Sequence, residues 1–237
     1  MSYDPVIQLS DVWKKYKLKI NSRRTLREDI GNIFSKKRNI SLTDNEFWAL
    51  QGINFSISRG ESVGLYGPNG SGKTTIIKLL SYVTTPTKGE VTVKGKIAPL
   101  ISVGAGFHPE LTGKENIYTN GTILGMSIKE IKEKEQQIIE FSGLEKKFIN
   151  MPVKNYSSGM NARLGFSVAI HSSAETFLLD EILAVGDSAF KEKCALKIDS
   201  LMKSKKTFLI VTHNLEQMKE LTSKIIYMEK GQITHIT

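Results

Sequence analysis

This chain of 237 residues has few cysteines and few long apolar runs. Cys194 is its single cysteine, so an internal disulfide is excluded and the chain suits a reducing compartment. On a helix, this residue most simply serves as a small buried apolar side chain. No apolar run approaches the roughly 20 residues that cross a bilayer, and Met1 to Ser10 lacks the basic-then-apolar pattern of a signal peptide. We therefore expect the chain in the cytoplasm or on the cytoplasmic face of a membrane.

Acidic residues are scarce in one segment near the N-terminus. The net charge of the chain is +9, and the stretch between Trp13 and Arg38 holds ten basic residues against Glu28 and Asp29, which leaves +8 there. The basic residues are Lys14, Lys15, Lys17, Lys19, Arg23, Arg24, Arg27, Lys36, Lys37 and Arg38. Apolar residues at the spacing of one helix face are Leu26, Ile30, Ile33 and Phe34. This basic amphipathic insertion, residues 17–45, indicates an anionic partner such as lipid head groups, nucleic acid or a phosphate-rich substrate.

Residues 67–74 match the phosphate-binding P-loop pattern G-x-x-x-x-G-K-[ST] at every fixed position. The apolar run Ser62–Tyr66 predicts a short buried strand before it, and Thr75–Leu80 predicts a helix after it, as the pattern requires. Glycines let successive N–H groups point at one anion, and the helix N-terminus adds a partial positive charge. Lys73 would reach the terminal phosphates, and Thr74 would offer its hydroxyl to Mg²⁺. The predicted phosphate-binding residues are Gly67, Pro68, Asn69, Gly70, Ser71, Gly72, Lys73, Thr74 and Thr75.

Two further apolar strands end in polar residues. The strand predicted at Thr176–Asp180 is followed by Glu181, and the strand predicted at Thr207–Thr212 ends at His213. Ligands of open α/β sheets lie beyond the carboxyl ends of the strands. Asp180 is therefore placed to hold the magnesium shell, and Glu181 is placed to act as a general base toward an attacking water. His213 is placed to contact a γ-phosphate or that water.

Other segments outline the fold. Strands are predicted at Val6–Ser10, Phe47–Ser58, Lys224–Glu229 and Gln232–Ile236, and helical patterns at 113–149 and 158–170. Glu90–Val93 and Lys96–Leu100 are expected to form a hairpin around Lys94-Gly95. Hydroxyls and a glycine at 156–160, where a helix begins, make a second anion site. Strands that alternate with helices predict a mostly parallel α/β core.

These motifs, in this order, resemble the nucleotide-binding subunit of ABC transporters over essentially the whole chain. The resemblance implies one domain over 1–237, with a mixed β-sheet core, an antiparallel β part and an inserted helical subdomain at approximately 105–160. It also implies ATP and Mg²⁺ as ligands and a head-to-tail homodimer, in which each ATP lies between one P-loop and the partner's signature loop. That loop appears here as Tyr156, Ser157, Ser158, Gly159 and Met160. Asp187 matches the D-loop, and His213 matches the switch histidine.

A narrower resemblance involves three stretches, at 104–118, 156–160 and 183–187. Together they are similar to the ATP-binding subunits of bacterial polysaccharide exporters. That branch moves O-antigen, capsule or wall teichoic acid, attached to a polyprenyl diphosphate lipid, across the cytoplasmic membrane with a polytopic permease, here expected in two copies. The resemblance places this chain peripherally on the cytoplasmic face of the inner membrane. Tyr16 would stack on adenine, with Trp13 as the alternative. The basic insertion would contact an anionic membrane surface or, as the alternative, form a helix packed on its own domain.

Two departures from the family's pattern stand out. The Q-loop glutamine, which binds the metal and the attacking water, is missing, and Ser102 occupies its position. Either Ser102 is a weaker metal ligand, or water completes the metal shell. Some exporters of this branch continue into a C-terminal carbohydrate-binding domain. This chain ends just after its last expected strand, so it is either a short form or a piece of a longer one.

Two other function classes compete with the exporter. The first is a soluble ABC-type ATPase that acts on nucleic acid or ribosomes, which the basic segment allows. Such proteins usually carry two P-loop cassettes or a long coiled coil, whereas this chain has one P-loop and no heptad run. The second is a nucleotide-gated regulator that does not hydrolyse, against which Glu181 and His213 argue. We therefore expect an ATPase without a nucleic-acid partner.

Overall fold

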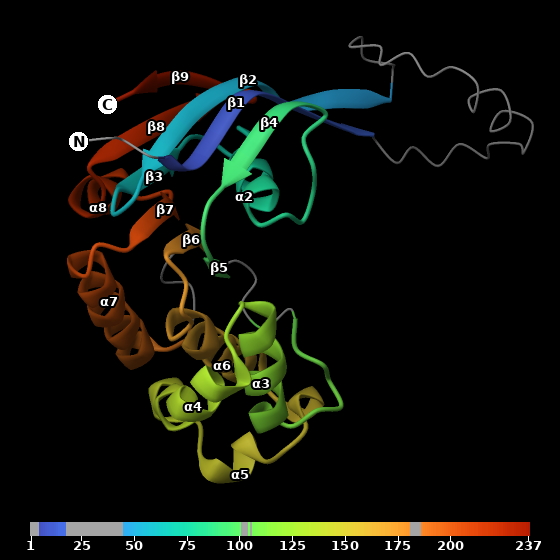
Figure 1. Cartoon of the computed structure of the whole chain (residues 1–237), viewed down its shortest axis with the longest axis vertical. Helices are drawn as coiled ribbons and strands as arrows, with labels where there is room; N and C mark the ends of the chain where they lie inside the picture. Colours follow the sequence, from blue (N-terminus) through green and yellow to red (C-terminus); the bar gives the residue numbers. More distant parts are fainter. Residues whose placement is uncertain (1–4, 18–44, 101–103, 105, 181–185) are drawn as a thin grey trace, which may run out of the picture.

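The computed structural model describes residues 5–17, 45–100, 104, 106–180 and 186–237. In this part of the chain, Figure 1 shows a β-rich half at one end and a helical lobe at the other. Three predictions lie outside the described residues: the amphipathic helix of the basic insertion, Ser102 as a metal ligand and Glu181 as a general base. The arrangement of the two described halves confirms the expected mixed α/β fold.

A six-stranded sheet runs through the centre of the molecule. Its strand order is β5 (Ile97–Leu100), β6 (Thr176–Asp180), β7 (Thr207–Val211), β3 (Ser62–Tyr66), β8 (Lys224–Glu229) and β9 (Gln232–Ile236). Every neighbouring pair is parallel except β8 and β9, which are antiparallel. The central strand β7 is buried at every position, as expected for a parallel sheet covered on both faces.

A three-stranded antiparallel sheet covers the P-loop helix. Its order is β2 (Glu46–Ser58), β1 (Pro5–Lys17) and β4 (Lys88–Val93), and Figure 1 shows it lying over α2 (Lys73–Leu80). Fully buried Ile7 and Leu50 from this sheet share one hydrophobic cluster with Ile76 and Ile77 of α2. This cluster fixes the P-loop between two sheets. β1 is longer than the strand expected at Val6–Ser10.

The prediction of a hairpin around Lys94-Gly95 is wrong. β4 pairs with β1, through Ile7 and Val93, whereas β5 pairs in parallel with β6, through Ala98 and Phe177. Gly95 turns the chain with a φ of +83°, but the turn carries it from one sheet to the other. The physical reason is burial: Ala98 and Leu100 on β5 are 0% and 5% exposed beside β6, which a two-stranded hairpin at the surface would not achieve.

Four helices form the lobe at the far end of Figure 1: α3 (Gly113–Ile123), α4 (Ile128–Ser142), α5 (Lys146–Ile149) and α6 (Ser158–Ile170). A short 3₁₀ turn, Val153–Asn155, precedes α6. Capping boxes start α3 at Thr112 and α4 at Ser127, because each side chain satisfies an N–H that the helix cannot. The lobe has its own core, with Ile117, Ile131, Leu164 and Val168 among its members.

Two helices follow strands in the C-terminal part of the chain, and of these only a helix around Cys194 was expected from the sequence. α7 (Ser188–Lys203) follows the β6 strand and α8 (Leu215–Leu221) follows β7. Phe190, Cys194 and Ile198 repeat every four residues along α7 and are buried, which is a helical period that the sequence does carry. Cys194 is 2% exposed, which confirms its role as a buried apolar side chain. Among the described residues, no helix has the length and apolarity to cross a membrane.

Candidate functional site

The P-loop lies between β3 and α2, at the carboxyl edge of the six-stranded sheet. Gly67 has no room for a side chain, since a Cβ there would lie 2.2 Å from the Met228 backbone oxygen. Gly70 and Gly72 take positive φ angles of +79° and +106°, which disfavour residues with a Cβ. The backbone path therefore requires glycine at these three positions, and for different reasons.

The loop presents donors for an anion. Lys73 is 7% exposed, and its Nζ donates to the Gly67 and Pro68 carbonyl oxygens over 2.6 and 2.9 Å. α2 begins at Gly72 without a side-chain cap and has no acidic residue in its first turn, so its N-terminal N–H groups and helix dipole favour negative charge. The buried Ser71 hydroxyl finds no hydrogen-bond partner within the described residues. A phosphate oxygen fits this set of donors.

The sheet register brings the predicted catalytic residues to the same edge. Asp180 pairs with Val211 on β7, and Val211 pairs with Leu65 on β3, two residues before Gly67. Because these strands are parallel, their carboxyl ends meet at one place, and His213 follows two residues after Val211. His213 is exposed there.

The metal candidates in this region are oxygen donors. Thr74 is exposed and Thr75 half-buried in the first turn of α2, while Asp180 ends β6. Hydroxyl and carboxylate oxygens suit Mg²⁺ completed by water and phosphate oxygens. The described residues contain no cluster of three or more metal-binding histidine, cysteine or acidic side chains.

The predicted signature loop begins α6 in the helical lobe. Ser157 caps the helix, its hydroxyl accepting from the Met160 N–H over 3.2 Å, and Ser158 is exposed. Tyr156 anchors the loop: its hydroxyl donates to the Phe148 carbonyl over 2.6 Å, and burial raises its pKa to about 12. A Cβ at Gly113 would lie 2.1 Å from that hydroxyl. Figure 1 shows this helix in the lobe and α2 under the three-stranded sheet.

Asp187 caps α7 and forms an ion pair with a residue of α6. Its Oδ1 caps α7 by accepting from the Phe190 N–H over 2.9 Å, and its Oδ2 lies 3.8 Å from the Arg163 guanidinium. Arg163 stands four residues after Gly159 on α6, so the two positions share one helix face. Sequence reasoning missed Arg163. The ion pair connects the predicted D-loop residue to the helix that carries the signature loop.

Tyr16 and Trp13 occupy different surroundings on β1. The Tyr16 ring lies 6.1 Å from the Phe47 ring, and Lys14 Nζ lies 5.1 Å from the Tyr16 centroid. Trp13 instead contacts Trp48 edge-on at 5.4 Å, and its Nε1 donates to Asp11 over 2.7 Å. Phe47 is a second aromatic residue beside Tyr16, and the sequence analysis did not identify it. Its position at the start of the strand that pairs with β1 could have indicated it.

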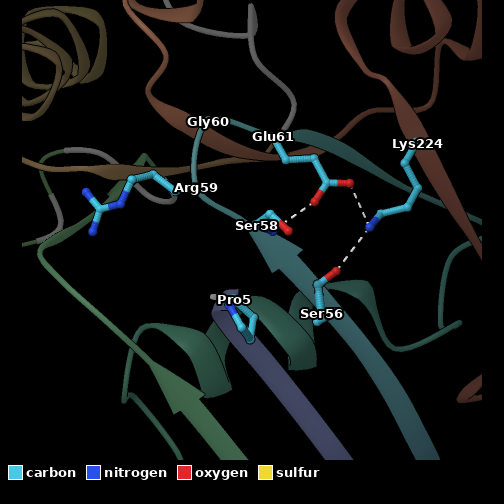
Figure 2. Close-up of a pocket in the computed structure, with 7 residues that line it drawn as sticks. All are labelled: Pro5, Ser56, Ser58, Arg59, Gly60, Glu61 and Lys224. Atoms are coloured by element: carbon cyan, nitrogen blue, oxygen red, sulfur yellow. Dashed lines mark hydrogen bonds and ion pairs between the residues drawn. The ribbon is translucent and has the colours of Figure 1, made fainter. Parts of the chain in front are cut away.

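A hollow of about 610 Å³ lies at the opposite, amino edge of the six-stranded sheet, and Figure 2 shows the residues that line it. Its lining comprises Pro5, Ser56, Ser58, Arg59, Gly60, Glu61 and Lys224. Glu61 and Lys224 form an ion pair at 2.7 Å, and Arg59 pairs with Glu175. The charged groups of this hollow thus compensate one another. It lies away from the edge where ligands of parallel sheets bind.

Comparison with known proteins places the chain in a family. The model of the ABC transporter family matches residues 50–184. The O-antigen export system ATP-binding protein RfbB of Klebsiella pneumoniae is 40% identical over 234 residues, which cover 98% of this chain and 94% of that protein. The teichoic acids export ATP-binding protein TagH of Listeria innocua is 45% identical over 187 residues, which cover 79% of this chain and 55% of that protein.

Solved structures agree on the fold. The dimeric post-hydrolysis structure of the ATP-binding cassette MJ0796, bound to ADP and Pi, superposes with a TM-score of 0.74 at 23% identity. The alignment covers 98% of this chain and 97% of that one. At this identity the likeness concerns the fold, and it extends over nearly all of both chains.

Proposed function

This chain belongs to the ABC transporter family, and from that premise we propose that it is the ATP-hydrolysing subunit of a system that exports a polyprenyl-diphosphate-linked polysaccharide or teichoic acid. ATP hydrolysis is supported chiefly by one observation: the P-loop, Asp180 and His213 meet at the same edge of the sheet. The export part is supported by the relatives, whose names are those of O-antigen and teichoic acid export subunits. They also favour the exporter over an ATPase that acts on nucleic acid.

The chemistry follows from the residues at that edge. The P-loop N–H groups and Lys73 bind the phosphates, and Lys73 exchanges the Gly67 and Pro68 carbonyls for phosphate oxygens. Thr74 and Asp180 would hold Mg²⁺, which when bound would neutralise charge on the β- and γ-phosphates. Glu181 takes the proton of the attacking water as general base. His213 contacts the γ-phosphate and helps to orient that water.

Two copies of the chain would complete each site. The exposed hydroxyl of Ser158 and the N-terminus of α6 lie in the helical lobe, apart from α2 of the same chain. In a head-to-tail homodimer, Ser157, Ser158 and Gly159 serve the nucleotide of the partner. The dimeric cassette bound to ADP and Pi, which shares the fold, supports a dimer. The Arg163–Asp187 pair would then link a chain's own site to its partner's.

The membrane partner is a polytopic permease, in two copies, on whose cytoplasmic face this chain would lie. A hollow of about 590 Å³ on the helical lobe supports a docking surface there. It is lined by Leu111, Thr112, Lys114, Glu115, Tyr118, Thr119 and Asn150. The basic segment Arg23 to Phe34, with arginines toward lipid phosphates, would add contact with anionic lipid. The glycopolymer itself would be bound through the permease.

The test is Glu181→Gln, with Glu220→Gln on the exposed side of α8 as the matched control. We expect Glu181→Gln to bind ATP with unchanged affinity but to lose at least about a hundredfold in turnover, which is within the range for a general base. In cells, the same variant should leave the lipid-linked polymer inside and remove it from the surface. Full turnover would exclude Glu181 as the base. Normal polymer at the surface, together with lost turnover, would refute the export role.

A further inference from the structure

Phe47 is an exposed apolar side chain on a strand where Leu50, Ile53, Phe55 and Ile57 are buried and Trp48 is half-buried. Its side chain is 43% exposed, whereas Leu50, Ile53 and Ile57 on the same strand are 0% exposed. An isolated exposed aromatic needs no explanation. Phe47, however, stands where the β1–β2 hairpin approaches the P-loop, and this position gives its exposure a use.

The face of the hairpin that carries Phe47 is the face that contacts the P-loop. Leu50 lies against Gly72, since a Cβ there would be 2.6 Å from Leu50 Cδ2. Leu50 pairs with Lys14 of β1. Alternate residues of a strand share a face, so Lys14 and Tyr16 do, as their 5.1 Å cation–π contact shows. A register irregularity after Lys14 then sets Phe47 opposite Tyr16, with their ring centroids 6.1 Å apart.

The P-loop is also fastened to this part of β2 by backbone hydrogen bonds. The Gly231 N–H donates to the Ser71 carbonyl over 3.1 Å, and the Gln51 N–H donates to the Gly231 carbonyl over 2.8 Å. Phe47 is two residues along the strand from Ala49, whose carbonyl also faces Gly72. Two residues of strand span roughly 7 Å. That distance lies within the reach of a nucleotide whose phosphates occupy the P-loop.

The geometry of the two rings decides how a base would be held. Stacked planar groups need about 3.5 Å between them, so a base inserted between two rings would separate their centroids by about 7 Å. The observed 6.1 Å, with a 35° tilt, leaves no room for insertion. Tyr16 is already contacted by Lys14 and Phe47 and is half-buried. Phe47 is therefore the ring with more open surface.

We propose that Phe47 contacts the base of the bound nucleoside triphosphate and, with Tyr16, forms one continuous aromatic wall. This inference rests on the proposed function, because it needs phosphates in the P-loop. It assigns to Phe47 a binding contact in addition to that expected of Tyr16. Aromatic stacking tolerates any planar base, so the wall provides affinity for the base rather than discrimination between purines.

The test compares ATP with inorganic tripolyphosphate, a ligand without a base, by titration calorimetry on the full chain. Phe47→Ala should raise the Kd for ATP about tenfold, the order expected for losing one stacked base, and leave the Kd for tripolyphosphate unchanged. Phe47→Tyr should restore ATP affinity. Leu196→Ala, which truncates another exposed apolar residue on α7, is the matched control and should change neither value.

The outcomes distinguish a failure of the base contact from a failure of the proposed function. An unchanged ATP affinity in Phe47→Ala, or an equal loss for both ligands, would overturn the base contact and leave the phosphate site intact. If the unaltered chain bound neither ATP nor tripolyphosphate, the proposed function would fail, and the base contact with it. Selective loss of ATP affinity, restored by tyrosine, would support the wall, because a purely structural ring would affect both ligands alike.

Discussion

Replacing Gly67 by alanine should destabilise the protein more than replacing Gly70, although Gly70 has the less favourable backbone angle. The two glycines allow two costs of adding a side chain to be measured separately: backbone strain at Gly70 and steric overlap at Gly67. Gly70 has a φ of +79°, and a Cβ added there would have nothing within 4 Å, so alanine at this position meets only backbone strain. Gly67 does not have a positive φ, so alanine there meets only its neighbours, the Met228 backbone oxygen at 2.2 Å and the Ser71 hydroxyl at 2.9 Å.

The magnitudes follow from these geometries. A non-glycine residue in the left-handed region costs about 1–2 kcal/mol, which is the expected loss in the free energy of unfolding for Gly70→Ala. Overpacking costs about 1–3 kcal/mol, and Gly67→Ala should lie at or above the top of that range, because a backbone oxygen of β8 cannot rotate away. Gly72→Ala combines a φ of +106° with contacts of 2.6 Å to Leu50 and 2.8 Å to the Ala49 oxygen, so we expect about 2–5 kcal/mol from the two costs together.

Urea unfolding of the three variants measures these losses, and ATP titration of the folded variants measures the site. Gly67→Ala should also weaken ATP binding, because relief of the clash moves the backbone whose N–H groups hold the phosphates. The order of destabilisation is the decisive result. If Gly70→Ala lost as much stability as Gly67→Ala, or more, steric contact with β8 would not be what requires glycine at position 67.

Two further predictions concern buried titratable groups. Burial, opposed by the hydrogen bond of its Nδ1 to the Ser167 carbonyl at 2.8 Å, lowers the pKa of His171 from 6.5 to about 4. As the pH falls below 6.5, His171 takes up a proton in the unfolded chain before it does so in the folded chain. The free energy of unfolding should therefore fall by about 2 kcal/mol between pH 6.5 and 5. His171→Gln should lack this part of the loss, and a pH profile identical to that of the unaltered protein would contradict the lowered pKa of His171. Burial also raises the pKa of the Cys194 thiol to about 12. At about pH 8, Ellman's reagent should therefore label the unfolded protein and leave the folded protein unlabelled. Rapid labelling of the folded chain would contradict this and show that α7 opens around Cys194.

Local sequence rules predicted the strands and turns that carry the nucleotide site. β3, β6 and the paired strands β8 and β9 begin and end where their apolar runs do. α6 begins at the serines of the signature loop, because Ser157 caps it. The P-loop follows from its glycines and lysine. Each of these features depends on residues within a few positions of one another, which is why pattern and spacing suffice for them.

Features that depend on distant partners escaped the sequence. Whether β4 pairs with β5 or with β1 is decided by what each strand buries, and alternation along the chain does not contain that information. The ion pair between Arg163 and Asp187 joins residues on two helices separated by β6. α7 is a different case: a helix was expected around Cys194, and the period of four in Phe190, Cys194 and Ile198 also indicates how far it extends.

Local patterns with their own chemistry were enough to specify a phosphate-binding turn, two acid- or histidine-terminated strands and a second capped helix with exposed hydroxyls. The register that brings Asp180, His213 and Gly67 to one edge came from the three-dimensional fold, since Leu65 of β3 and Val211 of β7, which pair there, are more than a hundred residues apart in the chain. The register irregularity between β1 and β2, which sets Phe47 opposite Tyr16, likewise came from the pairing of strands that are distant in the chain.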